Sequence, residues 1–345
     1  MFDRQTAVLI LNYNGHDFLK KFLPSVVANS KNADIVVIDN ASTDNSLKLL
    51  REEFLEKIEL IVLDKNKGFA AGYNDGINKL ERKYEYYALL NSDIEINSDW
   101  LPPLVTFLDN NKNAACCQPK ILSYSKKECF EYAGAAGGFL DRYYYPFCRG
   151  RVFSTIEIDQ SQYNHPVEVH WTSGAAMLIR AEIFKQQMGF DEDFFAHMEE
   201  IDLCLRIRAQ GKSLFCIPES TVFHVGGGTL NYNSPKKTYL NYRNNLSLII
   251  KNHDGWLPSM LFTRMLLDGI SACLFLSKFK FRHFFQIGFA HGYMYLNFYR
   301  NWQKRKALRA KRTKSNELYR GSIVFDYFIR KIKHFHQLNS RRFIL

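Results

Sequence analysis

The sequence predicts an α/β fold with a mostly parallel central sheet and flanking helices, followed by a basic, mainly α-helical C-terminal extension. Apolar runs alternate with segments of helical spacing over the first hundred residues, which is typical of parallel sheets covered on both faces. Charge also divides the chain: residues 1–235 hold 24 Lys and Arg against 31 Asp and Glu, whereas residues 236–345 hold 22 against 4. We therefore expect two regions that meet near residue 235.

The expected strands are continuous apolar runs, each long enough for a strand buried on both faces. They lie at residues 6–14, 34–40, 58–64 and 86–93. Helices are expected at residues 15–30, after a cap at Ser42, and at residues 72–80.

Later in the chain, a strand is expected at residues 171–180 and helices at 181–187 and 194–211. Residues 214–228 are expected to form a strand, a turn at Pro218, a short strand and a glycine loop. Residues 119–169 show no clear periodicity, and a helical, aromatic and basic pattern begins at residue 234.

Composition excludes several classes of protein. Hydrophobic residues make up 46% and charged residues 23%, which argues against disorder. The seven cysteines are odd in number and form no C-x-x-C pair, which favours reduced thiols in a cytosolic compartment. The N-terminus does not resemble a secretory signal, and Arg264 and Asp268 interrupt the most apolar segment, at 257–276, so no membrane span is expected.

Polar residues end several of the predicted strands. They are Asn12 and Asn14, Asp39 and Asn40, and Asn91 and Asp93. Because the carboxyl ends of parallel strands meet at one edge of a sheet, where ligands of such folds bind, we expect a binding site there.

Two of these acids suggest a nucleotide diphosphate. Asp39 could accept hydrogen bonds from a nucleobase or a ribose, although it could equally form a turn and cap a helix. Asp93 could hold Mg²⁺ or Mn²⁺ against phosphates, because such cations take one or two carboxylates plus water; a surface turn is the alternative. Between them, Gly68 and Gly72 allow close backbone approach, but they form no dinucleotide or Walker motif.

A second cluster lies in residues 197–206. On a helix, Glu199, Asp202 and Arg206 share a face, and Glu200 points about a quarter-turn away. Adjacent carboxylates suit acid–base chemistry because their repulsion can raise one pKa; helix-dipole compensation and an ordinary Asp–Arg pair are the alternative. His224, which follows an apolar run and precedes three glycines, is either a ligand or a structural histidine.

The order and spacing of these segments resemble inverting glycosyltransferase family 2, and within it the rhamnosyltransferase-like branch that builds bacterial surface polysaccharides. The resemblance covers roughly residues 5–230 and rests on NYNG, DNASTD, N-x-G-F-A-x-G-x-N-x-G, L-L-N-x-D, S-G-A-x-x-L-I-R, F-D-E-x-F-F and E-E-x-D-L-C-L-R. It implies the GT-A nucleotide-diphospho-sugar transferase fold for residues 1–235.

The resemblance also implies roles for individual residues. Glu200 stands at the position of the catalytic base, supported by Glu199 and Asp202, and Asp93 and His224 would hold a divalent metal, Mg²⁺ or Mn²⁺. The nucleotide-sugar would be bound by Asn12, Asn14, Asp39, Asn66, Gly68, Asn74, Asn91, Ser173 and Gly174, with Trp171 to Gly174 shaping the acceptor side. Two positions depart from the family pattern: Asn91 replaces the first acid of D-x-D, and the base is Glu where the family has Asp, which leaves Glu199 and Glu200 as alternatives.

The implied reaction is inverting transfer of a sugar from a dTDP- or UDP-sugar, with rhamnose the branch's typical sugar, to a saccharide hydroxyl on a lipid-linked glycan. The basic region 236–345, rich in aromatic residues, would then dock at the inner face of the cell membrane from the cytoplasm. The alternatives are a packed helical extension, a non-catalytic protein or a nucleic-acid-binding protein, but no helix-turn-helix, zinc or RNP pattern supports the last. A sugar-1-phosphate nucleotidyltransferase would need a glycine-rich basic loop near the first strand, which NYNGHDF is not.

Overall fold

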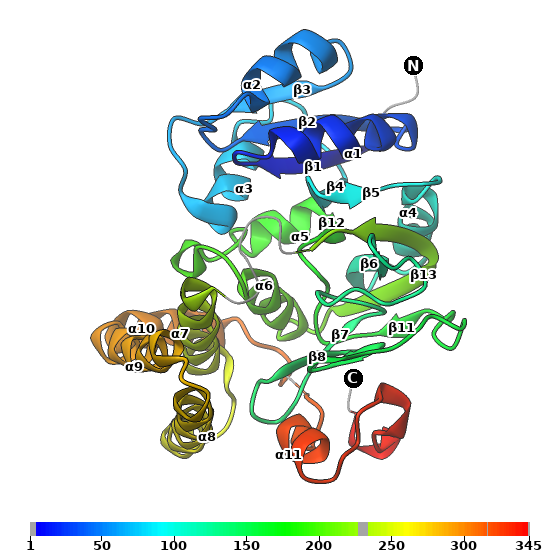
Figure 1. Ribbon diagram of the computed structural model, residues 1–345. Helices are drawn as coiled ribbons and strands as arrows, with labels where there is room; N and C mark the ends of the chain where they lie inside the picture. The colour runs from blue at the N-terminus through cyan, green and yellow to red at the C-terminus, as the bar shows by residue number, and fades with distance from the viewer. Residues whose placement is uncertain (1–4, 227–233, 316, 344–345) are drawn as a thin grey trace.

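The computed structural model describes residues 5–226, 234–315 and 317–343. A mixed sheet runs through the larger part of the molecule in the order β11-β13-β6-β12-β4-β1-β2-β3, with β5 paired to β13 (Figure 1). Its strands are β1 (Thr6–Asn12), β2 (Ala33–Asp39), β3 (Glu59–Val62), β4 (Tyr86–Asn91), β5 (Ile94–Glu95), β6 (Ala114–Ser123), β11 (Val167–Glu168), β12 (Ala176–Arg180) and β13 (Ser213–His224). Strands β3, β2, β1 and β4 are parallel, as predicted, and β12 pairs with β4 and β6 in the opposite direction.

Helices cover both faces of this sheet. They are α1 (His16–Ala28), α2 (Ser46–Leu49) with a π-helical continuation at Leu50–Phe54, α3 (Gly68–Asn78), α4 (Leu101–Asn110), α5 (Ala181–Gln186) and α6 (Glu199–Arg208). Along β1, Ala7 and Leu9 pack into one hydrophobic cluster, whereas Val8 and Ile10 pack into the other. Burial on both faces explains why these strands read as continuous apolar runs.

Several predicted elements have different limits. The expected strand at 171–180 begins only at Ala176, and the expected helix at 194–211 begins at Glu199 because Phe195, His197 and Met198 have positive φ. Pro218 makes no turn: β13 continues through it, and the register against β6 shifts between Ile217 and Thr221. The glycine loop expected after β13 lies largely outside the described residues.

Residues 119–169, which show no clear periodicity, complete β6 and form a small second sheet. Its strands are β7 (Gly138–Leu140), β8 (Pro146–Cys148), β9 (Arg151–Val152) and β10 (Thr155–Ile156). These strands are two or three residues long, too short to give a recognisable alternation of apolar and polar residues.

The region after residue 234 is helical, as predicted. It comprises α7 (Pro235–Asn252), α8 (Leu257–Ser277), α9 (Phe281–Leu296), α10 (Phe298–Ala310) and α11 (Ile323–Phe328). Leu246 and Ile250 of α7 belong to the same hydrophobic cluster as Ala7 and Leu9 of β1. Helix α7 therefore shares the core of the sheet-containing part, and it connects that part to α8, α9 and α10 (Figure 1).

Helix α8 is long and apolar enough to cross a membrane by length and composition. The two charges that interrupt it, Arg264 and Asp268, are buried and paired: Arg264 Nε lies 2.9 Å from Asp268 Oδ1. The Arg264 guanidinium also lies over the Tyr145 ring, 3.7 Å from its centroid. The charged edge of α8 thus faces the body of the protein.

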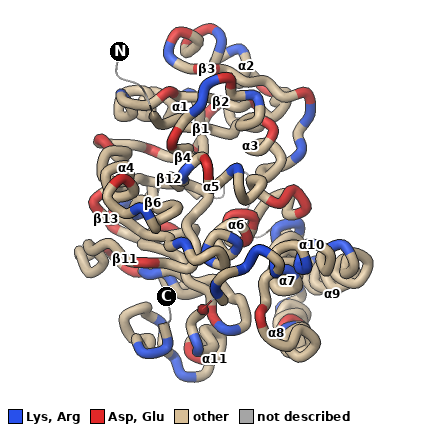
Figure 2. The backbone as a smooth tube through the Cα atoms, turned by 180° about the vertical axis from the view of Figure 1, so that it is seen from behind, with Lys and Arg blue, Asp and Glu red and all other residues tan. Residues whose placement is uncertain are grey.

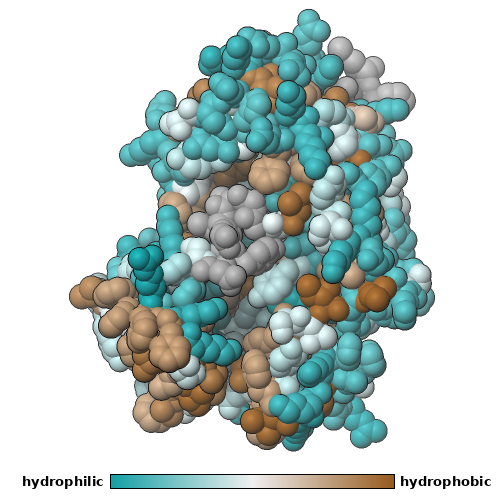
Figure 3. Space-filling model, viewed as in Figure 1, coloured by the Kyte–Doolittle hydropathy of each residue, from teal (hydrophilic) through white to brown (hydrophobic). Residues whose placement is uncertain are grey.

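The surface reflects the division of charge. Lys and Arg positions are dense around α7 and α10, as seen from behind the molecule in Figure 2. Hydrophobic side chains gather over α8 to α10 at the lower left of Figure 3.

Helix α7 also supports the turn that precedes α6. In this turn Phe195, His197 and Met198 have φ of 62°, 69° and 73°, a left-handed region that is costly for residues other than glycine. The buried Asn244 amide nitrogen lies within hydrogen-bond distance of three carbonyls of the turn, those of Phe194 (3.0 Å), Ala196 (2.9 Å) and His197 (2.6 Å). These bonds hold the backbone in its strained form.

We expect Asn244→Ala to loosen residues 194–198, because the Ala196 and His197 carbonyls would lose this donor, at about 1–3 kcal/mol for each group left unsatisfied, whereas Phe194 O keeps Arg243 as a donor. Hydrogen exchange measured by mass spectrometry should show faster exchange in a peptide that covers this turn. Asn245→Ala is a matched control, since Asn245 is equally buried but donates to Tyr144 O at 2.7 Å instead. Equal exchange at the turn in both variants would contradict the role of Asn244.

Candidate active site

The carboxyl ends of β1 and β2 lie side by side, with Asn12 opposite Asp39. Asn12 Nδ2 donates to Asp39 Oδ2 (3.0 Å), and the Ser42 amide donates to Asp39 Oδ1 (2.9 Å). Asp39 is fully buried, so it has the turn-forming role that the sequence offered as one alternative. Asn12 Oδ1 is buried without a partner. A nucleotide contact at this position stays a prediction.

Three further predicted residues shape the loops around this edge. Asn14, with φ of 51°, accepts the Thr43 amide at 2.7 Å. Asn66 Oδ1 accepts the Gly68 amide at 2.8 Å. Gly68 has φ of 90°, and a Cβ there would lie 2.5 Å from the Phe195 ring, so only glycine lets α3 begin against the turn before α6.

Asn74 bonds to the backbone of a distant segment, and its contact with a nucleotide-sugar stays a prediction. Its Nδ2 donates to Phe190 O (2.9 Å) and its Oδ1 accepts the Phe190 amide (3.0 Å). The side chain therefore joins α3 to the segment before α6 and does not lie with Asn12 and Asp39. An asparagine that bonds a backbone amide and a carbonyl at once looks no different in sequence from one that binds a ligand.

Asp93 and His224, distant in sequence, lie together at the end of β4 and β13. Asp93 Oδ1 is 3.1 Å from His224 Nε2, and Asn91 Nδ2 is 3.5 Å from the same nitrogen. On the other side of the imidazole, Glu131 Oε2 is 3.4 Å from His224 Nδ1. All three ionisable side chains are buried.

The two carboxylates govern the charge of this cluster. Burial alone would lower the pKa of His224, but Asp93 and Glu131 raise it to about 10. Burial would raise the pKa of Asp93 and of Glu131, yet the histidine holds both below their usual values. The imidazole is therefore a buried cation between two anions when no metal ion is present.

The donor atoms fit a divalent cation. Ligand atoms about 2.1 Å from one ion, at right angles, lie about 3 Å apart, close to the distance between Asp93 Oδ1 and His224 Nε2. Glu131, against the other imidazole nitrogen, is in the position of a carboxylate that orients a metal-bound histidine. Within residues 5–226, 234–315 and 317–343, no group of three or more His, Cys, Asp or Glu side chains could hold a metal ion, so phosphate and water would complete the coordination.

Glu131 was not predicted from the sequence. It lies in the part of the chain without clear periodicity, and its neighbours carry no recognisable motif. Its backbone joins β6 through the Ile121 carbonyl at 3.0 Å, and its carboxylate accepts the Ala133 amide. Only the folded structure brings it to His224.

Glu199 and Glu200 open α6 directly after the strained turn. Glu199 is buried and Glu200 partly so, and each has one carboxylate oxygen that is buried without a partner. Burial raises the pKa of Glu200 to about 7, and burial together with the neighbouring Glu200 raises that of Glu199 well above its usual value. Unpaired, desolvated carboxylates cost stability, so they are typical of sites whose partner is a substrate.

Contacts along the edge of the sheet connect these glutamates to the Asp93–His224 pair. A Cβ at Gly174 would lie 3.6 Å from Glu200 Cβ, and the next residue, Ala175, accepts the Asn91 amide at 2.9 Å. Ser173 is buried and bonded to Gln118 and Ala133, and Trp171 is buried, with its indole bonded to Phe139 O. Of the segment predicted to shape the acceptor side, Gly174 is the residue in contact with Glu200.

Asp202 forms the Asp–Arg pair that the sequence offered as one alternative, and its support of Glu200 stays a prediction. Its carboxylate oxygens lie 2.9 Å from Arg206 Nε and 2.8 Å from Lys251 Nζ, and it is fully buried. Asn252 also donates to it at 2.9 Å. Asp202 thus forms an ordinary ion pair with Arg206 on its own helix and extends it to Lys251 and Asn252 of α7. Its carboxylate is not bonded to either glutamate.

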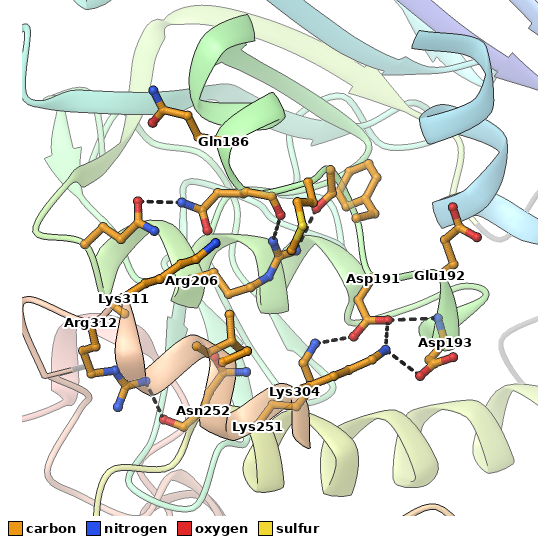
Figure 4. A pocket seen from close by; sticks show the side chains of 18 of the residues that line it. Gln186, Asp191, Glu192, Asp193, Arg206, Lys251, Asn252, Lys304, Lys311 and Arg312 are labelled. Carbon is orange, nitrogen blue, oxygen red and sulfur yellow. Dashed lines mark hydrogen bonds and ion pairs between the residues drawn. The ribbon is translucent and has the colours of Figure 1, made fainter. Parts of the chain in front are cut away.

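A cavity of about 390 Å³ lies next to this ion-pair network, between the segment before α6, α7 and α10 (Figure 4). Lys251 and Lys304 both bind Asp191, at 2.5 and 2.6 Å, and hold its pKa well below the usual value against the effect of burial. Asn74 is the only predicted nucleotide-sugar residue in its lining. The cavity therefore belongs to the support of the turn and is separate from the edge that carries Asp39 and Asp93.

Comparison with known proteins gives several rhamnosyltransferases among the relatives. The chain is 26% identical over 235 residues to the dTDP-rhamnosyl transferase RfbF of Shigella flexneri, a match that spans 65% of this chain and 73% of that one. It is 25% identical over 226 residues to the rhamnosyltransferase WbbL of Escherichia coli (strain K12), spanning 63% and 82%. It is 20% identical over 262 residues to the N-acetylglucosaminyl-diphospho-decaprenol L-rhamnosyltransferase of Mycobacterium tuberculosis (strain ATCC 25618 / H37Rv), spanning 72% and 85%.

Solved structures establish the fold. The crystal structure of GalNAc-T7 with UDP, GalNAc and Mn²⁺ has a TM-score of 0.55 at 18% identity, over 72% of this chain and 48% of that one. The mannosyltransferase PcManGT from Pyrobaculum calidifontis, in complex with GDP-Man and Mn²⁺, has a TM-score of 0.51 at 11% identity, over 89% and 85%. The predicted GT-A fold is confirmed. Residues 7–185 match the glycosyl transferase family 2 model, more than half of the chain, and the protein belongs to that family, in which it is rhamnosyltransferase-like.

Proposed function

We propose that the protein transfers a sugar, with inversion, from a nucleoside-diphospho-sugar to a saccharide hydroxyl. The observation that supports this proposal is the chain of contacts from Glu200, which has one buried carboxylate oxygen without a partner, through Gly174 and Ala175 to the edge that carries the Asp93–His224 pair. Glu200 can take a proton, and the Asp93–His224 pair can hold a diphosphate through a divalent cation. These are the two requirements of this displacement.

Glu200 acts as the general base. Its oxygen takes the proton of the acceptor hydroxyl as that oxygen forms a bond to the anomeric carbon. The bond between this carbon and the diphosphate oxygen breaks on the opposite face, and the transition state resembles an oxocarbenium ion. A pKa of about 7 places the base near the operating pH, where proton transfer is most effective. Glu199 is more deeply buried, and its raised pKa favours the protonated, neutral carboxyl or a proton shared with Glu200.

Asp93 and His224 would hold Mg²⁺ or Mn²⁺, with Asn91 beside them. The cation would neutralise the negative charge that develops on the leaving diphosphate. Asp39, Asn12, Asn14, Asn66 and Gly68 would form the nucleoside side of the donor site, where Asn12 Oδ1 still lacks a partner. Solved relatives of the fold contain UDP or GDP-Man with Mn²⁺, which supports a nucleotide donor and a divalent cation.

The relatives' names support the choice of substrates. RfbF is a dTDP-rhamnosyl transferase, and the mycobacterial relative acts on an N-acetylglucosaminyl-diphospho-decaprenol. We therefore assign dTDP-rhamnose as the first donor to test, before UDP-sugars, and a lipid-linked glycan as acceptor in the synthesis of a cell-surface polysaccharide. The enzyme would work in the cytoplasm at the inner face of the membrane, with residues 236–345 as the part that docks.

Glu200→Gln should abolish most transfer, by about 10²–10⁴-fold, because the amide cannot accept the proton. Binding of dTDP or UDP, measured by calorimetry with Mn²⁺, should remain. In the unchanged protein, kcat/KM should fall tenfold per pH unit below about 7, since only ionised Glu200 is a base and its pKa lies near 7.

Glu199→Gln is the matched control for Glu200. If Glu200 is the base, Glu199→Gln keeps more activity than Glu200→Gln and retains the acid limb of the pH profile. A near-normal rate in Glu200→Gln, or a profile that stays flat from pH 5.5 to 8, would remove Glu200 from the mechanism.

Asp93→Ala should weaken Mn²⁺ binding in the presence of a nucleoside diphosphate by about tenfold or more, because one of two protein ligands is lost. Manganese electron paramagnetic resonance titration measures this without turnover. Asp99→Ala, an exposed carboxylate six residues further along, should titrate as the unchanged protein does. An unaltered titration in Asp93→Ala would exclude Asp93 as a metal ligand.

A further inference from the structure

Helices α8 and α9 form a hairpin whose outer face is apolar and covered by no other described part of the chain. Its exposed side chains recur every four residues on each helix. They are Phe262, Leu266, Ile270 and Leu274 on α8, and Phe281, Phe285 and Phe289 on α9. At the connection between the helices, Phe279 is 80% exposed and stands between Lys278 and Lys280. We call these residues the hairpin patch.

The hairpin patch faces outward because the polar residues of α8 face inward. Asp268 is fully buried, where it binds Arg264 at 2.9 Å and lies 3.3 Å from His291 of α9. Arg264 in turn donates to Tyr143 O at 3.3 Å, in the turn between β7 and β8. These contacts fix the rotation of α8 about its own axis. The apolar side of α8 is therefore exposed because its polar side is held against the protein.

A second apolar patch lies on α11. Phe325, Phe328 and Ile329 are exposed, the last by 65%, while Asp326 of the same helix is buried and bonded to Tyr319 Oη at 2.9 Å. We call the three exposed residues the α11 patch. The helix repeats the arrangement of α8, with the acid turned inward and the apolar side turned outward.

Both patches have basic surroundings. Residues 255–343 contain 18 Lys and Arg against three acids. Two of these acids, Asp268 and Asp326, are buried, and the third, Glu317, lies 3.9 Å from Lys314. Among the bases, Arg264 and Arg305 are buried, and Arg300 and Lys304 pair with Asp193 and Asp191. The other bases outnumber the acids, so the charge around the patches is mostly positive.

The patches also lie at the same end of the molecule. Helices α8, α9 and α11 occupy the lower end in Figure 1 and again in the view from behind in Figure 2. Figure 3 shows hydrophobic side chains at both places, to the lower left and at the bottom.

We propose that the hairpin patch and the α11 patch together bind an anionic lipid bilayer, with Phe279 and its neighbours inserted among the headgroups. Aromatic and aliphatic side chains flanked by Lys and Arg bind in the interface of such membranes, and each base near anionic lipid adds to the attraction. The proposal deepens the proposed function and rests on it for its purpose, because a bilayer presents a lipid-linked acceptor.

Charge argues against a second copy of the chain as the occupant. A twofold dimer brings the same surface of both copies together, so the basic margins of the patches would face each other without acids to pair with. An anionic bilayer supplies the missing negative charge.

The test is cosedimentation of the full chain with vesicles of phosphatidylcholine, with and without phosphatidylglycerol. We expect binding that requires phosphatidylglycerol. Phe279→Glu/Phe281→Glu and Phe325→Glu/Phe328→Glu should each weaken partitioning by about tenfold or more, because apolar area is replaced by charge. Leu55→Glu/Val62→Glu adds the same charge at exposed positions near β3 and should bind as the unchanged protein does.

Trp256, 75% exposed at the start of α8, provides a second readout. Brominated phosphatidylglycerol should quench its fluorescence, and Trp256→Phe should remove most of that quenching. Absence of binding to anionic vesicles, or equal binding by all three double variants, would overturn the proposal. The proposal would also be overturned if the unchanged protein did not bind vesicles but formed a dimer in sedimentation velocity, and Phe279→Glu/Phe281→Glu dissociated that dimer.

Binding of dTDP and UDP to the same variants separates this proposal from the proposed function. Unchanged nucleotide binding with lost vesicle binding supports both. Vesicle binding in a protein that binds no nucleoside diphosphate would leave the membrane contact in place and overturn the transferase.

Discussion

The structure depends most on how the chain holds two adjacent carboxylates at the buried start of α6. Their desolvation raises both pKa values and disfavours the folded state at neutral pH, so surrounding contacts must fix them in place. The left-handed turn before α6 places them, and it is bonded on one side by the α3 amides and on the other by Asn244 of α7. The Asp191 and Asp202 ion pairs extend this support to α10.

These contacts give the C-terminal region a structural role at the candidate active site. A boundary near residue 235 follows from the charge distribution, yet α7 shares the core of the sheet and braces the turn before the glutamates. The region therefore combines two tasks within one helical assembly. Its inner side completes the candidate active site, and its outer side carries the apolar patches and the basic charge that we assign to a bilayer.

The sequence was most informative where one physical pattern dominates. Strands β1 to β4 are buried on both faces, so their apolar runs and polar ends could be recognised, and with them Asp39 and Asp93. The contacts of Asp202 with Lys251 and of Asn74 with Phe190 could not be predicted, because a contact across distant segments leaves no local pattern. Glu131 was missed for the same reason, and the turn before α6 was read as helix because left-handed φ at Phe195 and Met198 is imposed by tertiary contacts.

One consequence concerns the stretch from Glu199 to His224. Helix α6 and the twelve-residue β13, joined by a short turn, connect the glutamates to His224. The length of these two elements therefore fixes how far the histidine lies from the glutamates. Side chains alternate along a strand, and the irregular pairing between Ile217 and Thr221 decides which side of β13 His224 occupies. Gain or loss of a single residue there would turn the imidazole to the opposite face of the sheet. Among descendants of this gene, length variation should be purged from these 26 positions even where substitutions are accepted.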